Sequence, residues 1–326
     1  MKIKFIAFDS FGVKSMCTQV KTKDCTITID PGVAIETNSF PLPLTERARL
    51  VFEYENRIRK SCNESDIIII THYHYDHYLV EKELYIGKKL FVKDYKKNIN
   101  KSQKGRAREL FELLGDSPKG INIADGKKFK IGKTIIRFTK PMYHGRKETR
   151  LGYVVGVIIE DNNVKKIKKR NKNKKNENKK LFFTSDINGP IIDEYTDKII
   201  KENPDILIID GPATYILGFM LSYKDFAKAV LNLKKIVEKS RIRKIVLDHH
   251  TLRDYRYKDY LKIVYDAAKK KGIVVKTAAE FIGKKPKVLE GLKKYGKTKW
   301  NDWKTLSLDD LKEMIKRRKR HKGYKD

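Results

Sequence analysis

Side chains that bind metal ions are concentrated in one short segment, THYHYDH, residues 71 to 77. Three of the seven histidines in the chain, His72, His74 and His77, fall within six residues, and Asp76 precedes the last of them. Neutral imidazole and carboxylate groups suit zinc, and catalytic zinc sites keep one position open for water. A satisfied core or surface histidine has no such neighbours, so the segment predicts a metal site.

Further ligand-type side chains follow predicted strands elsewhere in the chain. His144 comes shortly after KTIIRF, Asp186 closes LFFTSD, and His249 and His250 follow KIVLD. Ligands that arrive on several strands can meet only at one edge of the sheets, so we expect these residues to converge on the segment above. Only His321 lies outside this pattern.

Strands and helices alternate along the chain, which predicts an α/β layered fold. Short β-branched runs predict strands at 3–8, 25–30, 66–70, 133–138, 153–160, 181–186, 205–210 and 243–248. Residues 45 to 60 predict a helix whose apolar face carries Ala48, Val51, Phe52 and Ile58.

Two later helices carry clearer start and stop signals. Ser222 is the predicted N-cap of a helix whose apolar stripe starts at Phe226 and continues to Val237. A second helix runs through Leu261 and is expected to stop at Gly272, because glycine readily adopts the left-handed conformation that ends helices.

The length and composition describe a globular protein. The chain has 326 residues, of which 40% are hydrophobic, enough for a buried core. No stretch approaches the roughly 18 apolar residues of a membrane span, and the N-terminus lacks the pattern of a signal peptide, so we expect a cytoplasmic protein. Cys17, Cys25 and Cys62 are irregularly spaced and predict small core residues, not a disulfide framework.

The formal net charge of +33 indicates either a polyanionic partner or the basic surface common among proteins of heat-loving organisms. Residues 164 to 180 hold ten lysines and arginines against one glutamate and predict a solvated, mobile loop. The rest of the chain is also strongly basic. The hypothesis is that this loop and the C-terminal region bind nucleic acid or another polyanion.

The predicted domain covers residues 1 to 283, and residues 284 to 326 form a basic C-terminal extension. Ser307 and Asp310 predict the start of a helix in this extension, with Leu308, Leu311 and Ile315 at helical spacing. The sequence alone leaves open whether this helix contacts the main domain.

THYHYDH resembles the HxHxDH signature of the metallo-β-lactamase superfamily. The resemblance extends in order over residues 1 to 283, through CTITIDPG, His144, Asp186 and the histidine after KIVLD. FTSDINGP and IIDGPATY are similar to an archaeal branch of this superfamily known only as predicted metal-dependent hydrolases. The resemblance implies an αββα sandwich of two sheets with helices outside, in which IIII is a strand buried on both faces.

The resemblance also implies a dinuclear metal centre, with zinc expected and iron or manganese as alternatives. His72, His74 and His144 would hold one metal, Asp76, His77 and His249 the second, and Asp186 would bridge them. His249 is preferred because it matches the LTH pattern of the ribonuclease Z branch, although the roles of His249 and His250 could be reversed. Asp30 either orients a ligand histidine or serves only as a turn residue.

The implied reaction is hydrolysis by a hydroxide that bridges two metals, oriented by Asp76. His250 is the nearest candidate for the proton donor to the leaving group, and Tyr143 is a weaker one. The basic charge and a loose similarity of IIDGPATY to a segment of ribonuclease Z favour a phosphodiester or nucleic-acid substrate. The alternatives are a lactone, thioester or small-ester hydrolase, and a basic RNA-binding protein whose metal is only structural.

Overall fold

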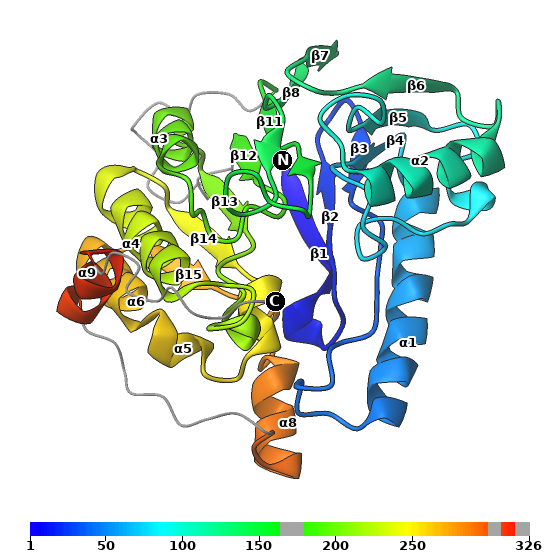
Figure 1. Cartoon of the computed structure of the whole chain (residues 1–326). Coiled ribbons are helices and arrows are strands. Elements are labelled where there is room, and N and C mark those ends of the chain that lie inside the picture. Colours follow the sequence, from blue (N-terminus) through cyan, green and yellow to red (C-terminus); the bar gives the residue numbers. More distant parts are fainter. Residues whose placement is uncertain (164–178, 299–307, 317–326) are drawn as a thin grey trace.

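Two β-sheets face each other at the centre of the molecule, and helices cover their outer faces (Figure 1). The first sheet has the order β1 (Lys2–Phe8), β2 (Met16–Lys21), β3 (Thr26–Ile29), β4 (Ile67–Ile70), β5 (Lys89–Val92) and β6 (Gly120–Ile123). The second has the order β15 (Val274–Lys276), β14 (Lys244–Leu247), β13 (Ile206–Ile209), β12 (Lys180–Phe183), β11 (Val157–Asp161), β8 (Thr134–Phe138) and β7 (Lys128–Ile131). The structure, a computed structural model, describes residues 1–163, 179–298 and 308–316.

The helix layers complete the αββα sandwich that the sequence predicts. The first sheet carries α1 (Leu44–Asn63) and α2 (Lys101–Leu114), and the second carries α3 (Asp193–Glu202), α4 (Tyr223–Lys239) and α6 (Lys262–Lys271) (Figure 1). Shorter elements are β9 (Met142–Tyr143), β10 (Tyr153–Val154), α5 (Tyr257–Tyr260), α7 (Ala278–Phe281), η1 (Asp9–Phe11), η2 (Lys82–Leu84), η3 (Thr214–Ile216) and η4 (His250–Arg253).

The strand sequences explain how the layers hold together. All four isoleucines of β4 are buried, so this strand packs on both faces. In β13, Ile208 belongs to the core shared by the two sheets, whereas Leu207 and Ile209 pack in a second core with α4. Since successive side chains of a strand point to opposite faces, a continuous apolar run fills both spaces at once.

Parallel pairing brings many strand ends to one edge of the sandwich. β3, β4, β5 and β6 are parallel neighbours in the first sheet, and β12, β13, β14 and β15 are parallel neighbours in the second. Their carboxyl ends therefore open toward the same edge of each sheet, which is where open α/β sheets usually place their sites.

The predicted helix over residues 45 to 60 is present as α1, and its buried face is the predicted one in part: Ile58 is buried and Val51 packs against the core. Phe52 is 67% exposed and Ala48 is also exposed. The core-facing side chains include Leu50, Tyr54 and Ile58. The ring of Tyr54 stacks on Phe11 of η1, with 5.6 Å between ring centroids.

Two other helices agree with their predictions. The Ser222 hydroxyl accepts a hydrogen bond from the Asp225 N–H, and the stripe from Phe226 to Val237 is buried. Gly272 ends α6 in the left-handed conformation, with φ of 70°. The strand predicted over residues 153 to 160 is instead divided into β10 and β11.

The C-terminal region contains α8 (Lys287–Tyr295) and α9 (Leu308–Lys316). Val288 of α8 and Leu311 of α9 are both fully buried, and α9 packs on α4 (Figure 1). The division of the chain at residue 283 stays a prediction. Most of the predicted basic loop, residues 164 to 178, lies outside the described residues, as do 299–307 and 317–326. None of the helices in the described segments is long and apolar enough to cross a membrane.

Candidate metal centre

One group of ligand atoms forms between the two sheets from His72, His74, His144 and Asp186, all within 4.8 Å of one another. The His72 Nε2 and His74 Nδ1 atoms are 3.1 Å apart. Asp186 Oδ2 lies 3.2 Å from His144 Nε2 and 3.7 Å from His72 Nε2. These residues come from the ends of β4, β9 and β12, so separate strands meet as the sequence predicts.

A second group contains Asp76, His77 and His249. The Asp76 carboxylate is 4.0 Å from His77 Nε2 and 3.8 Å from His249 Nε2. Asp186 Oδ2 also reaches this group, at 3.2 Å from His77 Nε2 and 3.4 Å from His249 Nε2. A single carboxylate oxygen thus faces imidazole nitrogens from both groups.

His250 lies beside both groups, with its Nε2 atom 3.5 Å from Asp186 Oδ2. It also forms a third set of possible ligand atoms with Asp186 and His249. The structure therefore brings all eight predicted site residues together, while the division of roles between His249 and His250 stays a prediction. The ring of Tyr143, the weaker candidate for a proton donor, packs against Tyr153 with 4.7 Å between centroids.

The signature segment is held by its backbone and by the buried Tyr73. β4 ends at Ile70, and the His77 N–H donates to the His74 carbonyl oxygen at 2.9 Å, so a turn and not a continuing strand gathers the ligands. The Tyr73 hydroxyl donates to the Lys93 carbonyl oxygen at 2.6 Å, and its N–H donates to the Gln103 side chain at 3.0 Å. Through these two hydrogen bonds Tyr73 anchors the segment that carries His72 and His74.

Three buried carboxylates orient the histidine rings. Asp30 lies 2.9 Å from His77 Nδ1, Asp9 lies 2.6 Å from His249 Nδ1, and Asp210 lies 2.9 Å from His250 Nδ1. Where the carboxylate is ionised it accepts a hydrogen bond from the Nδ1–H, which leaves Nε2 as the atom that would bind a metal in the neutral ring.

Of these three carboxylates, the sequence indicated only Asp30. Asp9 and Asp210 were missed, although each follows a strand, as Asp186 does. A strand-end aspartate is therefore the signal that could have found them.

Arg253 is a further residue that the sequence analysis missed. It is buried, its Nε donates to Asp9 Oδ1 at 2.7 Å, and its Nη2 donates to Asp76 Oδ2 at 3.3 Å. Its guanidinium group therefore links the carboxylate behind His249 to a predicted ligand of the second group. A buried arginine paired with carboxylates is the arrangement that offsets the cost of burying each charge.

Backbone conformations at the site are unusual for residues other than glycine. Asp30, Ser185 and His249 have φ values of 49°, 58° and 76°. A non-glycine residue with positive φ costs free energy and persists only where its surroundings impose it, and such residues cluster at functional sites. All three follow strand ends and border the ligand groups, so the strain is concentrated where the side chains need to be aimed.

The donor set fits divalent metal ions. His77 Nε2 and Asp186 Oδ1 are buried without a hydrogen-bond partner among the described residues. Burial by itself would lower the pKa of His249, but the carboxylates of Asp9 and Asp186 outweigh it and raise this pKa to about 10. The same balance, with Asp186 and Asp30 as the carboxylates, raises the pKa of His77 well above its usual range. The negative charge of the site thus demands cations, and nitrogen and oxygen donors suit zinc, iron or manganese.

A pocket of about 480 Å³ opens beside the first ligand group. Its lining includes His144, the exposed arginines Arg146 and Arg150, and the carboxylates Glu148 and Asp225. Phe219, which is 85% exposed, lines it together with other apolar residues. The pocket therefore combines apolar surface with charged side chains of both signs next to His144.

Gly32 permits the close approach of two chain segments at the site. A Cβ atom built on Gly32 would lie 2.0 Å from the Tyr78 backbone nitrogen and 2.4 Å from that of His77. We expect Gly32→Ala to lower the free energy of unfolding by about 1–3 kcal/mol and to weaken metal binding, because the ligand loop has to move. Thermal unfolding and metal titration measure both effects. Gly120→Ala is the matched control, since no atom lies within 4 Å of its Cβ; equal behaviour of the two variants would contradict the prediction.

Together, the αββα layers and the histidine and aspartate cluster at the sheet edge define a metallo-β-lactamase-fold protein whose site can hold a divalent metal. A UPF0282 protein of Methanopyrus kandleri is 36% identical and covers 89% of this chain and 97% of that protein. A UPF0282 protein of Sulfurisphaera tokodaii is 39% identical, with 89% and 91% covered. The chain belongs to the UPF0282 family.

Family models and solved structures give weaker similarity than these relatives do. No protein-family model matches the chain. YhfI of Bacillus subtilis, a metallo-β-lactamase fold protein, aligns with a TM-score of 0.47 and 17% identity over 84% of this chain and 94% of that chain. Igni18, a metallo hydrolase of Ignicoccus hospitalis, aligns with a TM-score of 0.39 and 15% identity over 84% and 93%. Because these scores lie below 0.5, the fold assignment depends on the chain's own strand order and layers.

Proposed function

We propose that this protein is a metal-dependent hydrolase with two metal ions, most simply zinc, in one centre. The observation that carries the proposal is the position of Asp186 Oδ2, which lies 3.2 Å from His144 Nε2 in one ligand group and 3.2 Å from His77 Nε2 in the other. One carboxylate oxygen shared by two sets of nitrogen donors is the arrangement that a dinuclear centre requires.

Each residue of the centre has a distinct task. His72 Nε2, His74 Nδ1 and His144 Nε2 would hold one metal, while Asp76, His77 Nε2 and His249 Nε2 would hold the other. Bound divalent metals supply a water of lowered pKa and polarise the oxygen of the substrate. The Asp76 carboxylate, which is partly accessible, would orient that water and accept its hydrogen bond.

His250 is the proposed proton donor to the leaving group. Its Nε2 atom would have to carry that proton while Nδ1 donates to Asp210, so the donating form is the imidazolium. Burial opposes this form and lowers the pKa of His250 well below its usual range, so the ring would carry the proton only transiently during turnover. In the neutral form the lone pair of Nε2 faces Asp186, and His250 then resembles a metal ligand. The two forms give different outcomes when His250 is replaced.

The pocket beside His144 supports a phosphodiester as the substrate class. Arg146 and Arg150 are exposed on its wall, and neither has an ion pair with a carboxylate among the described residues. Guanidinium groups recognise phosphate oxygens through paired hydrogen bonds. A phosphodiester lying on these arginines would present its phosphorus toward the ligand groups.

The apolar wall favours a second candidate, the hydrolysis of a lactone, thioester or small ester. Phe219 and Met220 are 85% and 58% exposed, which is unusual for side chains of their size, and both line the pocket. An acyl chain or aryl group would cover them. The phosphodiester remains first because Arg146 and Arg150 have no ion pair among the described residues and can bind its phosphate oxygens.

Metal content and substrate choice can be tested together. Protein purified without chelators is expected to contain close to two metal ions per chain by elemental analysis. Its activity should be measured on bis-p-nitrophenyl phosphate, a thioester and a lactone, before and after chelation. We expect metal-dependent turnover of the phosphodiester, with Arg150→Gln raising KM for this anion and leaving an uncharged ester unaffected.

Other results of the same panel identify the alternatives. Turnover confined to the uncharged esters, and sensitive to Phe219→Ala, would replace the phosphodiester with the acyl substrate. Metal without turnover of any substrate would favour a binding protein with a structural metal. A chain that contains no metal after purification and takes up none on titration would refute the proposed centre.

A further inference from the structure

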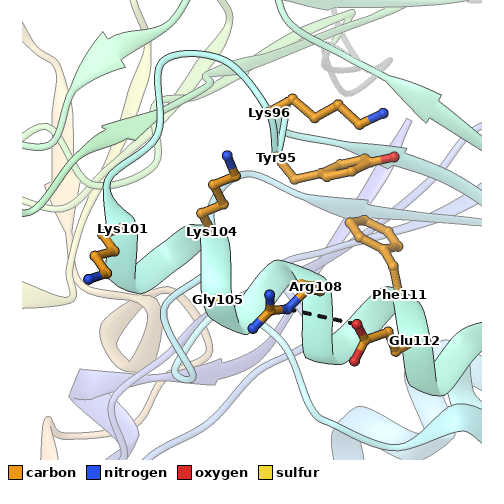
Figure 2. A pocket seen from close by; sticks show the side chains of 8 residues that line it. All are labelled: Tyr95, Lys96, Lys101, Lys104, Gly105, Arg108, Phe111 and Glu112. Carbon is orange, nitrogen blue, oxygen red and sulfur yellow. Dashed lines mark ion pairs between the residues drawn. The ribbon is translucent and has the colours of Figure 1, made fainter.

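A second hollow lies on the outer side of α2, away from the metal ligands. It has a volume of about 610 Å³ and is bordered by Tyr95, Phe111 and four basic side chains, Lys96, Lys101, Lys104 and Arg108. Figure 2 shows the two aromatic rings next to each other, with 4.5 Å between their centroids. The hollow therefore has an aromatic wall within a basic rim.

The basic rim has little charge compensation. Glu112 is the single acidic residue of the lining, and it pairs with Arg108 at 3.7 Å (Figure 2). Across the part of the chain that the structure describes, no carboxylate side chain pairs with Lys96, Lys101 or Lys104, and all three are exposed. Lys96 Nζ lies over the Tyr95 ring, 5.5 Å from its centroid. Cations without a carboxylate partner around an aromatic wall complement a ligand that has both negative charge and flat rings.

Gly105 lies in the middle of α2 and forms part of the same wall. Glycine is less favourable than alanine inside a helix. A Cβ atom at this position would meet nothing within 4 Å, so no packing contact of the described residues requires a glycine here. The absence of a side chain instead leaves the helix surface flat where it borders the hollow.

The start of α2 also contacts the metal centre. The Gln103 side chain donates to the Leu151 carbonyl oxygen at 2.6 Å and lies 3.5 Å from His74 Nε2. Asn100, the N-cap of α2, donates to the carbonyl oxygen of Arg150, which lines the pocket beside His144. From Lys101 the basic side chains then continue along about 10 Å of helix.

We propose that the hollow on α2 binds single-stranded polynucleotide, with a base stacked on Tyr95 and Phe111 and phosphates bound by the lysines. Stacking on aromatic side chains combined with basic contacts to the backbone is how proteins hold single strands without sequence preference. As a way of guiding a substrate to the metals, this inference rests on the proposed phosphodiesterase function. As a binding site it stands on the hollow alone.

The test compares binding of two ten-nucleotide oligomers by fluorescence anisotropy, one of adenosine and one of the same length lacking bases. The intact protein is expected to bind the adenosine oligomer more tightly. Tyr95→Ala should weaken that binding by about 5- to 150-fold and leave the abasic oligomer nearly unaffected, since one stacked base is lost. Lys104→Gln should weaken both oligomers and reduce the slope of log K against log salt by about 0.7.

Gly105→Leu gives a variant whose folding should not suffer, because leucine is the better helix former and its side chain would enter the hollow. We expect it to weaken oligomer binding at least tenfold with an unchanged or raised unfolding midpoint. The matched control for Lys104→Gln is Lys270→Gln, which removes one positive charge from an exposed lysine of α6. It should bind both oligomers as the unmodified protein does.

The outcomes for this site and for the proposed enzyme are separable. If Tyr95→Ala and Gly105→Leu bind both oligomers as the unmodified protein does, the inference is wrong, even if the protein hydrolyses phosphodiesters. Binding that is lost only on deletion of residues 164 to 180 would likewise overturn it. If these variants lose binding while no phosphodiester is hydrolysed, the binding site stands and the proposed activity fails. Tyr95→Ala, Lys104→Gln and Gly105→Leu should all hydrolyse bis-p-nitrophenyl phosphate at the rate of the unmodified protein.

Discussion

Asp186→Ala is expected to lose at least one of the two proposed metals and essentially all hydrolysis. Asp186 Oδ2 lies within 3.7 Å of imidazole nitrogens from both ligand groups, so its removal weakens both sites at once. Replacing a residue that only orients a ligand costs about 10- to 100-fold in metal affinity, and the loss of a shared ligand should exceed this. Elemental analysis after chelation and reloading, with hydrolysis of bis-p-nitrophenyl phosphate, measures both effects.

Two further variants make this test specific. Asp186→Asn keeps the shape of the side chain and removes its charge, so it should also lose metal. Asp197→Ala removes a carboxylate that is 63% exposed on α3, and it should retain metal and activity. An Asp186→Ala protein that still binds two metals after chelation and reloading would rule out a bridging role for this residue.

Replacement of the two adjacent histidines is expected to give different losses. His249→Ala should lose one metal and nearly all hydrolysis, because His249 joins Asp76 and His77 in one ligand group. His250→Ala should keep both metals and lose roughly 10²- to 10⁴-fold in rate if it acts as a general acid. Metal content and rate are measured on the same preparations, so a loss of rate alone is distinguished from a loss of metal.

Neighbouring residues supply controls for this pair. Asp9→Asn and Asp210→Asn remove the carboxylates at the Nδ1 atoms of His249 and His250, 2.6 Å and 2.9 Å away. The first should weaken metal binding by about 10- to 100-fold, and the second should lower the rate with metal retained. If His250→Ala loses a metal and His249→Ala does not, the two roles are reversed. The positive φ of His249 favours this residue as the metal ligand, because strain of this kind is kept where a side chain must be aimed.

Much of the site could be predicted from sequence because the signal was local. His72, His74, Asp76 and His77 are close in the chain, and apolar strands run directly into His249 and Asp186. Ligand chemistry together with strand periodicity therefore predicted which residues would meet, before any contact was known. The alternation of strands and helices predicted an α/β layered fold, and the resemblance of THYHYDH to the metallo-β-lactamase signature implied the αββα arrangement.

The prediction failed where a residue's surroundings decide its orientation. Residues 45 to 60 do form a helix, but hydrophobic spacing selected Phe52 for the buried face, whereas Tyr54 is buried through its stacking on Phe11. Hydrophobic spacing along the chain carries no information about such a contact between distant residues.

The sequence by itself determined which ligand-type side chains follow strands and which strands deliver them, because each such pairing depends on residues near one another in the chain. Only the tertiary structure decided which groups support them. Asp9 contacts His249 across 240 positions, and Arg253 joins Asp9 to Asp76. An aspartate after a strand is ordinarily a turn residue, and an arginine in a short helical turn is ordinarily solvated. Both become part of the centre only because packing of the two sheets removes water from the edge where they lie and leaves each charge dependent on the others.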